Sequence, residues 1–187
     1  MGFLENWRIG ARLALGYAVM IALMVTASAV TWINLRGIEQ ANALLQGEQS
    51  ERLALAREWR ENIVANSARS MAMSLDAGGQ ISRYFSETAK AVTARTTVIQ
   101  KRYEALERTD QGLQIGTRLA EARQRYLSAR DGLLAARGDD EQVRLRADAF
   151  QALTRDYIVA ADAMVAWQLE RQKALGAEVE RRIEQAH

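Results

Sequence analysis

Two arginines and a tyrosine in the second half of the chain have the types and the spacing to bind an anion. Tyr126 follows Arg123 by three positions and precedes Arg130 by four, and residues three or four apart share one face of a helix. A planar guanidinium binds a carboxylate through two parallel hydrogen bonds, and a phenol hydroxyl can add another. Two or three arginines around one cavity therefore predict a small dicarboxylate or tricarboxylate ligand.

Side chains from other segments are expected to complete this site. Arg69 flanks the apolar seam of the first expected helix of the bundle, residues 36–76. Thr93 lies beside the seam of the second, residues 82–107, and Tyr157 lies within the seam of the fourth, residues 140–186. Antiparallel neighbours bring the middles of helices to one level, so these side chains can face the arginines. The predicted ligand-binding residues are Arg69, Thr93, Arg123, Tyr126, Arg130 and Tyr157.

A purely structural role is the alternative for these arginines. They can pair with carboxylates of neighbouring helices or extend to solvent from a flanking position, as most arginines do. The candidate carboxylate partners are Glu87, Asp131, Asp156 and Asp162. Asn62 and Asn66 lie four apart and could hydrogen-bond a ligand, although amides in a helix seam more often set the register.

The composition excludes several classes of protein. The 187 residues include no Pro and no Cys, and 25 basic against 23 acidic side chains leave a net charge of +2. Without Pro, long uninterrupted helices are favoured, so we expect an all-α fold. The absence of Cys excludes disulfides and thiolate metal sites, and the sole histidine, His187, is the last residue. We therefore expect no enzyme, no metal, no cofactor and no nucleic-acid partner.

Three short stretches break the helical pattern: residues 76–79, 109–112 and 138–140. Connections this short force consecutive helices to run antiparallel, which predicts an up-down-up-down four-helix bundle. The expected helices are 36–76, 82–107, 112–137 and 140–186. Gly78 or Gly79 and Gly138 suit the left-handed position that ends a helix, and the expected N-terminal caps are Ser82, Thr109 or Asp110, and Asp139.

Heptad repeats predict which faces of these helices are buried. The predicted seams are Phe85, Val92, Ile99 and Leu106; Leu113, Ala120, Leu127 and Leu134; and Val143, Phe150, Tyr157 and Met164. In the middle one of these helices, the accompanying seam position falls on Gly116, Arg123 and Arg130. The pattern thus predicts two arginines at positions that should be core.

Residues 13–35 contain no charged side chain, and about 20 apolar residues suffice to cross a bilayer core. We expect a transmembrane helix here, with Trp7 and Trp32 at its two interfaces. Arg8 and Arg12 precede it, which places residues 1–12 in the cytoplasm and residues 36–187 outside the cell membrane. A cleaved signal peptide is the alternative, since Ala27-Ser28-Ala29 resembles a cleavage site.

The N-terminal run from Asn6 to Leu13, the apolar span and the helix beginning Trp32-Ile33-Asn34-Leu35 resemble the start of a bacterial methyl-accepting chemotaxis receptor. The remainder is similar to the periplasmic four-helix-bundle sensor domain of that family. Sensor histidine kinases and cyclases can carry the same module.

The resemblance implies a homodimer in the bacterial inner membrane, a ligand pocket in the half of the bundle far from the membrane, and signalling by a small displacement of the last helix. In acid-sensing members, arginines of the first and third helices hold the carboxylates with hydroxyl support from the other two. This arrangement corresponds to Arg69, Arg123 and Arg130 with Thr93, Tyr126 and Tyr157. It also implies that a second span and a cytoplasmic signalling part would follow His187, through which alone cytoplasmic partners would be reached.

Two functions therefore stand as hypotheses from the sequence. The first is the ligand-binding region of a transmembrane chemoreceptor for a small organic acid of the malate, succinate or citrate class. The alternative is a membrane-anchored helical bundle used only for contacts with other proteins, whose binding would be insensitive to small anions.

Overall fold

The computed structural model describes the backbone of residues 9–185, and the side chains of that range except those of residues 9–15, 30–31, 33–42, 44–46, 182–183 and 185. The expectations for Trp7, Arg8, most of the run from Asn6 to Leu13, and His187 therefore lie outside the described residues, as does part of the expected membrane segment.

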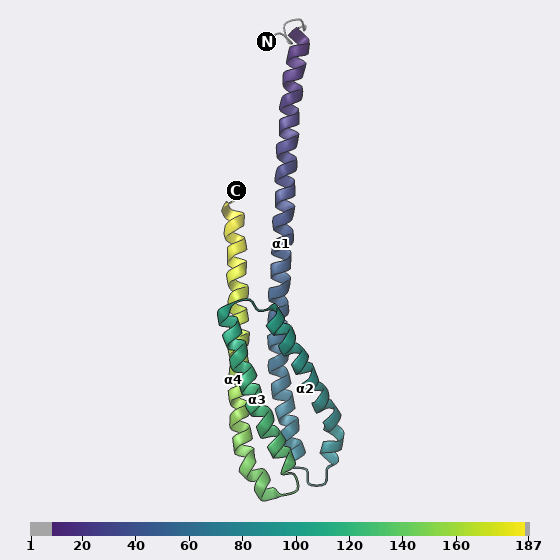
Figure 1. The fold of residues 1–187 in the computed structure, drawn as a ribbon, viewed down its shortest axis with the longest axis vertical. Coiled ribbons are helices and arrows are strands. Elements are labelled where there is room, and N and C mark those ends of the chain that lie inside the picture. Colours follow the sequence, from purple (N-terminus) through teal and green to yellow (C-terminus); the bar gives the residue numbers. More distant parts are fainter. Residues whose placement is uncertain (1–8, 186–187) are drawn as a thin grey trace. The chain divides into compact units, whose positions relative to one another are not determined.

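Four helices make up the described chain, in the order α1 (Ile9–Ser74), α2 (Gln80–Leu106), α3 (Asp110–Ala135) and α4 (Asp140–Gln185), as Figure 1 shows. Residues 9–185 contain no strand, so the fold is all-α. The ends of α2, α3 and α4 differ from the expected ends by two residues or fewer. Helix α1 is one helix of 66 residues that includes the expected membrane segment and the expected first helix of the bundle except its last two residues, 75 and 76.

The chain divides into two compact units, residues 1–45 and residues 46–187. In the first unit, the side chains described between residues 16 and 29 are all exposed. As far as the structure describes the chain, no helix is long and apolar enough to cross a membrane.

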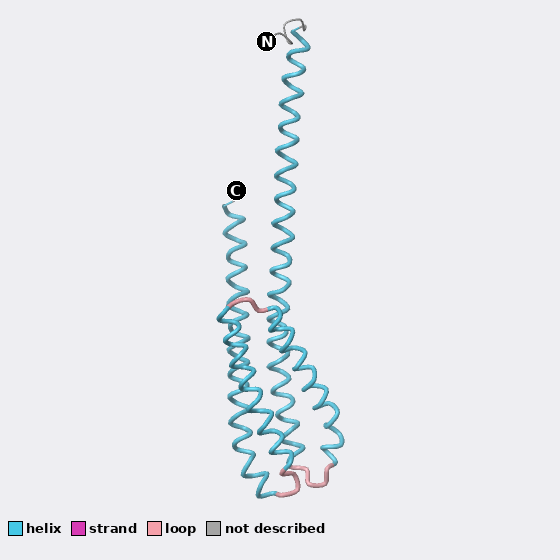
Figure 2. Tube along the Cα trace, in the orientation of Figure 1, coloured by secondary structure: helices cyan, strands magenta, loops and turns pink. Residues whose placement is uncertain are grey.

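In the second unit, all four helices contribute to one hydrophobic core. Its largest fully buried side chains include Trp59 of α1, Tyr103 of α2, Leu119 of α3 and Tyr157 of α4. The α1–α2 and α3–α4 loops lie at one end of this unit and the α2–α3 loop at the other (Figure 2). The core thus holds together segments that are distant in sequence.

The buried face of α3 differs by one position from the predicted one. Leu113 is 44% exposed, whereas Leu119, Tyr126 and Leu133 are buried. These three are also seven apart, so α3 carries two adjacent apolar heptads. The buried heptad is the one that contains Tyr126, whose ring contacts Phe150 and Tyr157. Arg123 and Arg130 are therefore half-buried beside the seam, and their prediction as seam residues was wrong.

The other two complete heptads agree with the structure. All four predicted residues of α4 are buried, namely Val143, Phe150, Tyr157 and Met164. In α2, Ile99 and Leu106 are buried, and Phe85 and Val92 are half-buried.

The helix ends combine left-handed glycines with side-chain caps. Gly79 and Gly138 have φ of 70° and 92°, a region that glycine enters without steric cost. Gly79 was expected to follow the end of the first helix, but it is the N-cap of α2, and α1 ends at Ser74. Thr109 accepts a hydrogen bond from the Gly112 N–H, and Asp139 accepts one from the Gln142 N–H. The sequence predicted Ser82 as the N-terminal cap of α2, and this prediction was wrong. The Asp76 carboxylate accepts a hydrogen bond from the Ile81 N–H at 2.6 Å instead.

Two ion pairs connect the second-unit part of α1 with α2. The Arg95 guanidinium donates two hydrogen bonds to Glu58, at 2.6 and 2.7 Å. Arg102 donates two to Glu51, at 2.6 and 2.9 Å. Hydrogen bonds from these guanidinium groups lower the pKa of both carboxyls, although all four side chains remain substantially exposed.

Candidate functional site

Five of the six predicted ligand-binding residues line one cavity in the second unit. These five come from α2, α3 and α4: Thr93, Arg123, Tyr126, Arg130 and Tyr157. Asn62 and Asn66 of α1 also line this cavity. The cavity volume is about 20 Å³, enough for a single water-sized group.

Within the part of the chain that the structure describes, the Arg123 guanidinium donates hydrogen bonds only to neutral groups. It donates to the Gln100 Oε1 at 2.7 Å, the Thr97 hydroxyl at 2.7 Å and the Thr93 carbonyl at 3.2 Å. Among the side chains that the structure describes, no carboxylate pairs with it, so its positive charge is uncompensated locally. A half-buried cation with neutral acceptors favours binding of an anion at this point.

Arg130 lies at the opposite side of Tyr126 and has one acidic neighbour. Its Nε and Nη2 both donate to the Asp131 Oδ1, at 3.0 and 2.9 Å, and its Nη1 donates to the Thr93 hydroxyl at 3.1 Å. The Asp131 side chain is 67% exposed. Because water can solvate the exposed Asp131 carboxylate when it leaves Arg130, a ligand carboxylate can replace it at low cost.

The other proposed acidic partners do not neutralise the two arginines. The Asp162 carboxylate pairs with Arg60, and Glu87 pairs with Lys90. Asp156 is exposed. Of the acidic partners expected for the two arginines, Asp131 therefore pairs with Arg130, and none pairs with Arg123 among the described side chains.

Thr93 acts on the site through its neighbours. Its hydroxyl donates to the Ala89 carbonyl at 2.8 Å and accepts from both Asn66 Nδ2 and Arg130 Nη1 at 3.1 Å. A hydroxyl has one proton to donate and two lone pairs to accept with. These contacts use all three, so in this arrangement Thr93 positions Asn66 and Arg130 and has no capacity left for a ligand.

The two tyrosines line the cavity, and the Tyr126 ring packs against both Tyr157 and Phe150. The ring centroid of Tyr126 lies 5.4 Å from that of Phe150 and 5.2 Å from that of Tyr157. Burial raises the pKa of Tyr126, an effect that the nearby Ser70 hydroxyl and the Arg130 charge partly offset. Burial also raises the pKa of Tyr157. Both phenols are therefore neutral at physiological pH and can donate a proton in a hydrogen bond.

Three polar atoms at this cavity lack a hydrogen-bond partner of normal geometry within the described chain. They are the Asn62 Nδ2, the Asn66 Oδ1 and the Tyr126 hydroxyl oxygen. Asn66 is 4% exposed and Tyr126 3% exposed, and buried polar groups without partners are costly and uncommon. Tyr157 differs, because its hydroxyl accepts a hydrogen bond from the Trp59 Nε1 at 2.6 Å.

Arg69, the sixth predicted residue, does not line this cavity. It is half-buried, and its Nη1 is another buried atom without a partner among the described residues. The predicted set of site residues left out Asn62 and Asn66, although their i, i+4 spacing placed both on one face of α1. Gln100 and Thr97, which hold Arg123, carried no signal in the sequence.

A larger groove adjoins the cavity and shares Thr93 and Arg130 with it. Its volume is about 570 Å³, which is within the range of small-molecule sites. The described residues that line it include three cations, Lys90, Arg130 and Arg137, and no carboxylate. The remaining lining is hydroxyl or apolar: Ser70, Met73, Ser82, Ser86, Ala89, Thr93, Ala94 and Leu134.

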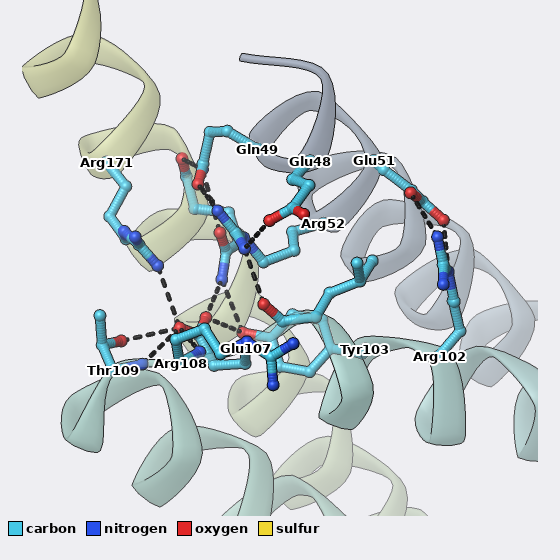
Figure 3. A network of polar contacts seen from close by, with 12 residues as sticks. Glu48, Gln49, Glu51, Arg52, Arg102, Tyr103, Glu107, Arg108, Thr109 and Arg171 are labelled. Atoms are coloured by element: carbon cyan, nitrogen blue, oxygen red, sulfur yellow. Dashed lines mark hydrogen bonds and ion pairs between the residues drawn. The ribbon is translucent and has the colours of Figure 1, made fainter. Parts of the chain in front are cut away.

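A second polar cluster surrounds Glu107, where α2 ends (Figure 3). The carboxylate is 2% exposed. It accepts hydrogen bonds from the N–H groups of Arg108 and Thr109, from the Thr109 hydroxyl, from the Gln168 amide and from the Arg171 guanidinium. Burial raises the pKa of Glu107, but these donors together outweigh burial and lower it to about 2.

Arg52 joins this cluster from α1. It donates to the Leu106 carbonyl at 2.8 Å and to the Gln49 Oε1 at 3.0 Å, and Gln49 in turn donates to Gln168 of α4. The charged groups of Glu107, Arg52 and Arg171 all have partners, so the geometry is that of a structural connection between α1, the α2–α3 loop and α4.

No group of three or more His, Cys, Asp or Glu in the described part of the chain is arranged to hold a metal ion. No protein-family model matches the chain, and no curated protein matches it in sequence. Functional assignment therefore rests on the geometry of the cavity and its cations.

Proposed function

We propose that residues 46–187 are the ligand-binding sensor of a transmembrane receptor and bind a small di- or tricarboxylate between α1, α2 and α3. The observation that carries this proposal is Arg123, a half-buried guanidinium with only neutral partners beside a cavity with unpartnered polar atoms. Arg130, held 3.1 Å from Thr93, supplies the second cation. An anion that contacts both guanidinium groups relieves their repulsion and their desolvation.

The architecture that we propose is an antiparallel up-down-up-down bundle. The ion pairs between α1 and α2 support it, because the residue numbers fall from Glu58 to Glu51 as they rise from Arg95 to Arg102. The alternation of the connecting loops between the two ends of the unit also supports it (Figure 2).

We also propose that residues 13–35 anchor the protein in the bacterial inner membrane, with the N-terminus in the cytoplasm and the sensor in the periplasm. The absence of charge in this stretch supports the anchor. So do the exposed apolar side chains between Tyr17 and Val25, 53–68% exposed, which need apolar surroundings. The helix continues through Ala27-Ser28-Ala29 without a break, whereas a signal peptide would be cleaved there.

The cavity must open for the ligand to enter, since in this arrangement it has room for a single water-sized group only. The route that we propose leads from the adjacent groove past Arg130, whose only ionic partner among the described side chains is the exposed Asp131. Binding would then select one packing of the helices over another. Tyr157 carries this change to α4, because it lines the cavity and bonds to Trp59 of α1.

Signalling would follow from a small displacement of α4 in a homodimer. A chemotaxis receptor is the output that we propose, and a histidine kinase or a cyclase would use the same sensor. No step in this mechanism makes or breaks a covalent bond.

The test is calorimetric titration of the full chain in detergent micelles with malate, succinate, citrate, aspartate and benzoate. We expect saturable binding of a multi-carboxylate and none of benzoate. Arg123→Ala should abolish binding while the helical signal and its melting curve stay close to those of the unchanged protein. The matched control is Arg125→Ala, an exposed arginine two positions away on α3, which should bind normally.

Three results would contradict this function or the role of Arg123 in it. No saturable binding across the panel would favour a bundle used for protein contacts. Unchanged affinity in Arg123→Ala would remove Arg123 from the site, and loss of its helical melting transition would make the residue structural.

A further inference from the structure

The cavity between the helices presents one unpartnered acceptor and one unpartnered donor. The acceptor is the Asn66 Oδ1, and the donor is the Asn62 Nδ2. Both residues line the same cavity, as does Tyr126, whose hydroxyl is also without a partner of normal geometry. Since such atoms are costly when buried, their arrangement indicates the chemistry of the group that would satisfy them.

The orientation of the Asn66 amide is fixed by its surroundings. Its Nδ2 donates to the Ala89 carbonyl at 3.2 Å and to the Thr93 hydroxyl at 3.1 Å. A carbonyl oxygen can only accept, so the amide nitrogen must face Ala89 and the amide oxygen must face elsewhere. The Asn66 Oδ1 therefore needs a donor, which a carboxylate cannot supply.

A hydroxyl group matches both asparagines. It donates one proton, here to Asn66, and accepts hydrogen bonds, here from Asn62. An ammonium group would only donate and would leave the Asn62 Nδ2 without a partner, and a methylene group would leave both atoms without one. The cavity volume of about 20 Å³ fits one group of hydroxyl size.

The neighbouring groove has room for the rest of such a ligand. Its volume is about 570 Å³, and Arg130 and Thr93 form the boundary that it shares with the cavity. A carboxylate next to the hydroxyl would lie at Arg123 and Arg130, which both line the cavity, and a second one would lie in the groove among Lys90 and Arg137.

We propose that the ligand is a hydroxy acid with at least two carboxylates, whose hydroxyl occupies the inner cavity between Asn62 and Asn66 while its carboxylates bind Arg123 and Arg130 of the cavity and Lys90 and Arg137 of the groove. This inference rests on the proposed function and makes it more specific. Asn66 becomes the residue that determines specificity for the hydroxyl, and Thr93 positions it.

The test compares acids that differ only in the hydroxyl. The full chain is titrated with malate against succinate and with citrate against tricarballylate, with aspartate as the amine counterpart of malate. We expect the hydroxy acid of at least one pair to bind about tenfold to a hundredfold more tightly, as one donor and one acceptor are otherwise left unpaired. Aspartate should bind more weakly than malate.

Two variants assign the preference to the asparagines. Asn66→Leu and Asn62→Leu should each reduce the preference to about threefold or less by weakening binding of the hydroxy acid, with little change for the acid that lacks the hydroxyl. Asn62 makes no hydrogen bond within the described chain through its Nδ2, so Asn62→Leu should fold even if Asn66→Leu does not. The control is Ser67→Ala, whose hydroxyl bonds only to the Val64 carbonyl of its own helix turn.

Each result decides between the two proposals. Equal affinity for both members of each pair, or a preference that survives in the folded asparagine variants, would overturn the hydroxyl assignment and leave the carboxylate sensor standing. Tighter binding of aspartate than of malate would overturn it in favour of an ammonium group. No binding of any acid would overturn the proposed function itself.

Discussion

At the scale of single residues, Arg123 and Glu107 show how two charged groups in one bundle differ in role. Glu107 is almost fully buried, yet hydrogen-bond donors surround it and the Arg171 guanidinium lies 3.0 Å away. Arg123 is less buried but has only neutral acceptors. A charge with a complete set of partners stabilises a fold, whereas a charge without a counterion is available to a ligand.

The low pKa of Glu107 makes stability depend on pH. Its pKa is about 2 in the folded chain against an ordinary value of 4.5, so protonation favours the unfolded state. The contribution is complete above about pH 5 and is lost as the pH falls towards 2, and it amounts to on the order of 3 kcal/mol. We expect urea denaturation to give a lower free energy of unfolding at pH 3 than at pH 6.

Glu107→Gln isolates this contribution. The variant should be less stable at pH 6, and the difference between its stabilities at pH 6 and pH 3 should be smaller than in the unchanged chain. Glu104→Gln, an exposed change on the same helix, is the control and should keep the full dependence. An identical pH dependence in Glu107→Gln would show that other carboxylates cause it.

Position 112 requires glycine because the Glu107 side chain leaves no room there for a Cβ atom. A Cβ atom at position 112 would lie 2.3 Å from the Glu107 Cδ, and the donors around the carboxylate prevent it from moving. Gly112→Ala should therefore cost about 1–3 kcal/mol in the free energy of unfolding, measured by urea denaturation. Gly116→Ala is the matched change, because its nearest contact would be Tyr103 at 3.8 Å, and it should be neutral or stabilising.

At the scale of elements, the caps determine where α2 begins. The Asp76 carboxylate accepts from the N–H groups of Ile81 and Ser82 from outside the helix, at 2.6 and 3.3 Å. Two orphan donors of the first turn are satisfied in this way, and the charge also suits the positive end of the helix dipole.

Asp76→Ala should therefore lower the free energy of unfolding by about 1 kcal/mol. Ser82→Ala should cost less, because Ser82 lies within the helix and its main partner is Arg137 on the surface. Thermal denaturation of both variants checks the order, and a larger loss in Ser82→Ala would restore the serine as the cap.

At the scale of the whole molecule, residues 46–187 form one compact unit with a core drawn from four helices. We expect this segment alone to be helical by circular dichroism and to unfold in a single cooperative transition. A gradual, non-cooperative loss of helical signal on heating would show that the unit depends on residues 1–45.

The ligand should stabilise this unit by mass action. At a concentration of one hundred times its dissociation constant, a carboxylate that binds only the folded state adds about 2.7 kcal/mol. The midpoint of thermal unfolding should therefore rise in the unchanged protein and stay constant in Arg123→Ala. An equal rise in both would indicate a general effect of the anion and not the proposed site.

The sequence by itself determined the all-α class and, within two residues, the ends of α2, α3 and α4, because these depend on local features. Such features are the absence of Pro, the left-handed glycines at positions 79 and 138, and apolar periodicity. The sequence also predicted that six residues share one site, and five of them line one cavity. This was predictable because helices joined by short loops run antiparallel, which places their middles at one level.

Only the tertiary structure decided which of two apolar heptads on α3 is buried. Both heptads satisfy the period, and the packing of Tyr126 against Phe150 and Tyr157 comes from another helix. The same is true of Arg69, which lies outside the cavity, and of Asn66, whose amide is fixed by Ala89 and Thr93 of α2. Such contacts join residues far apart in the chain, so no local pattern encodes them.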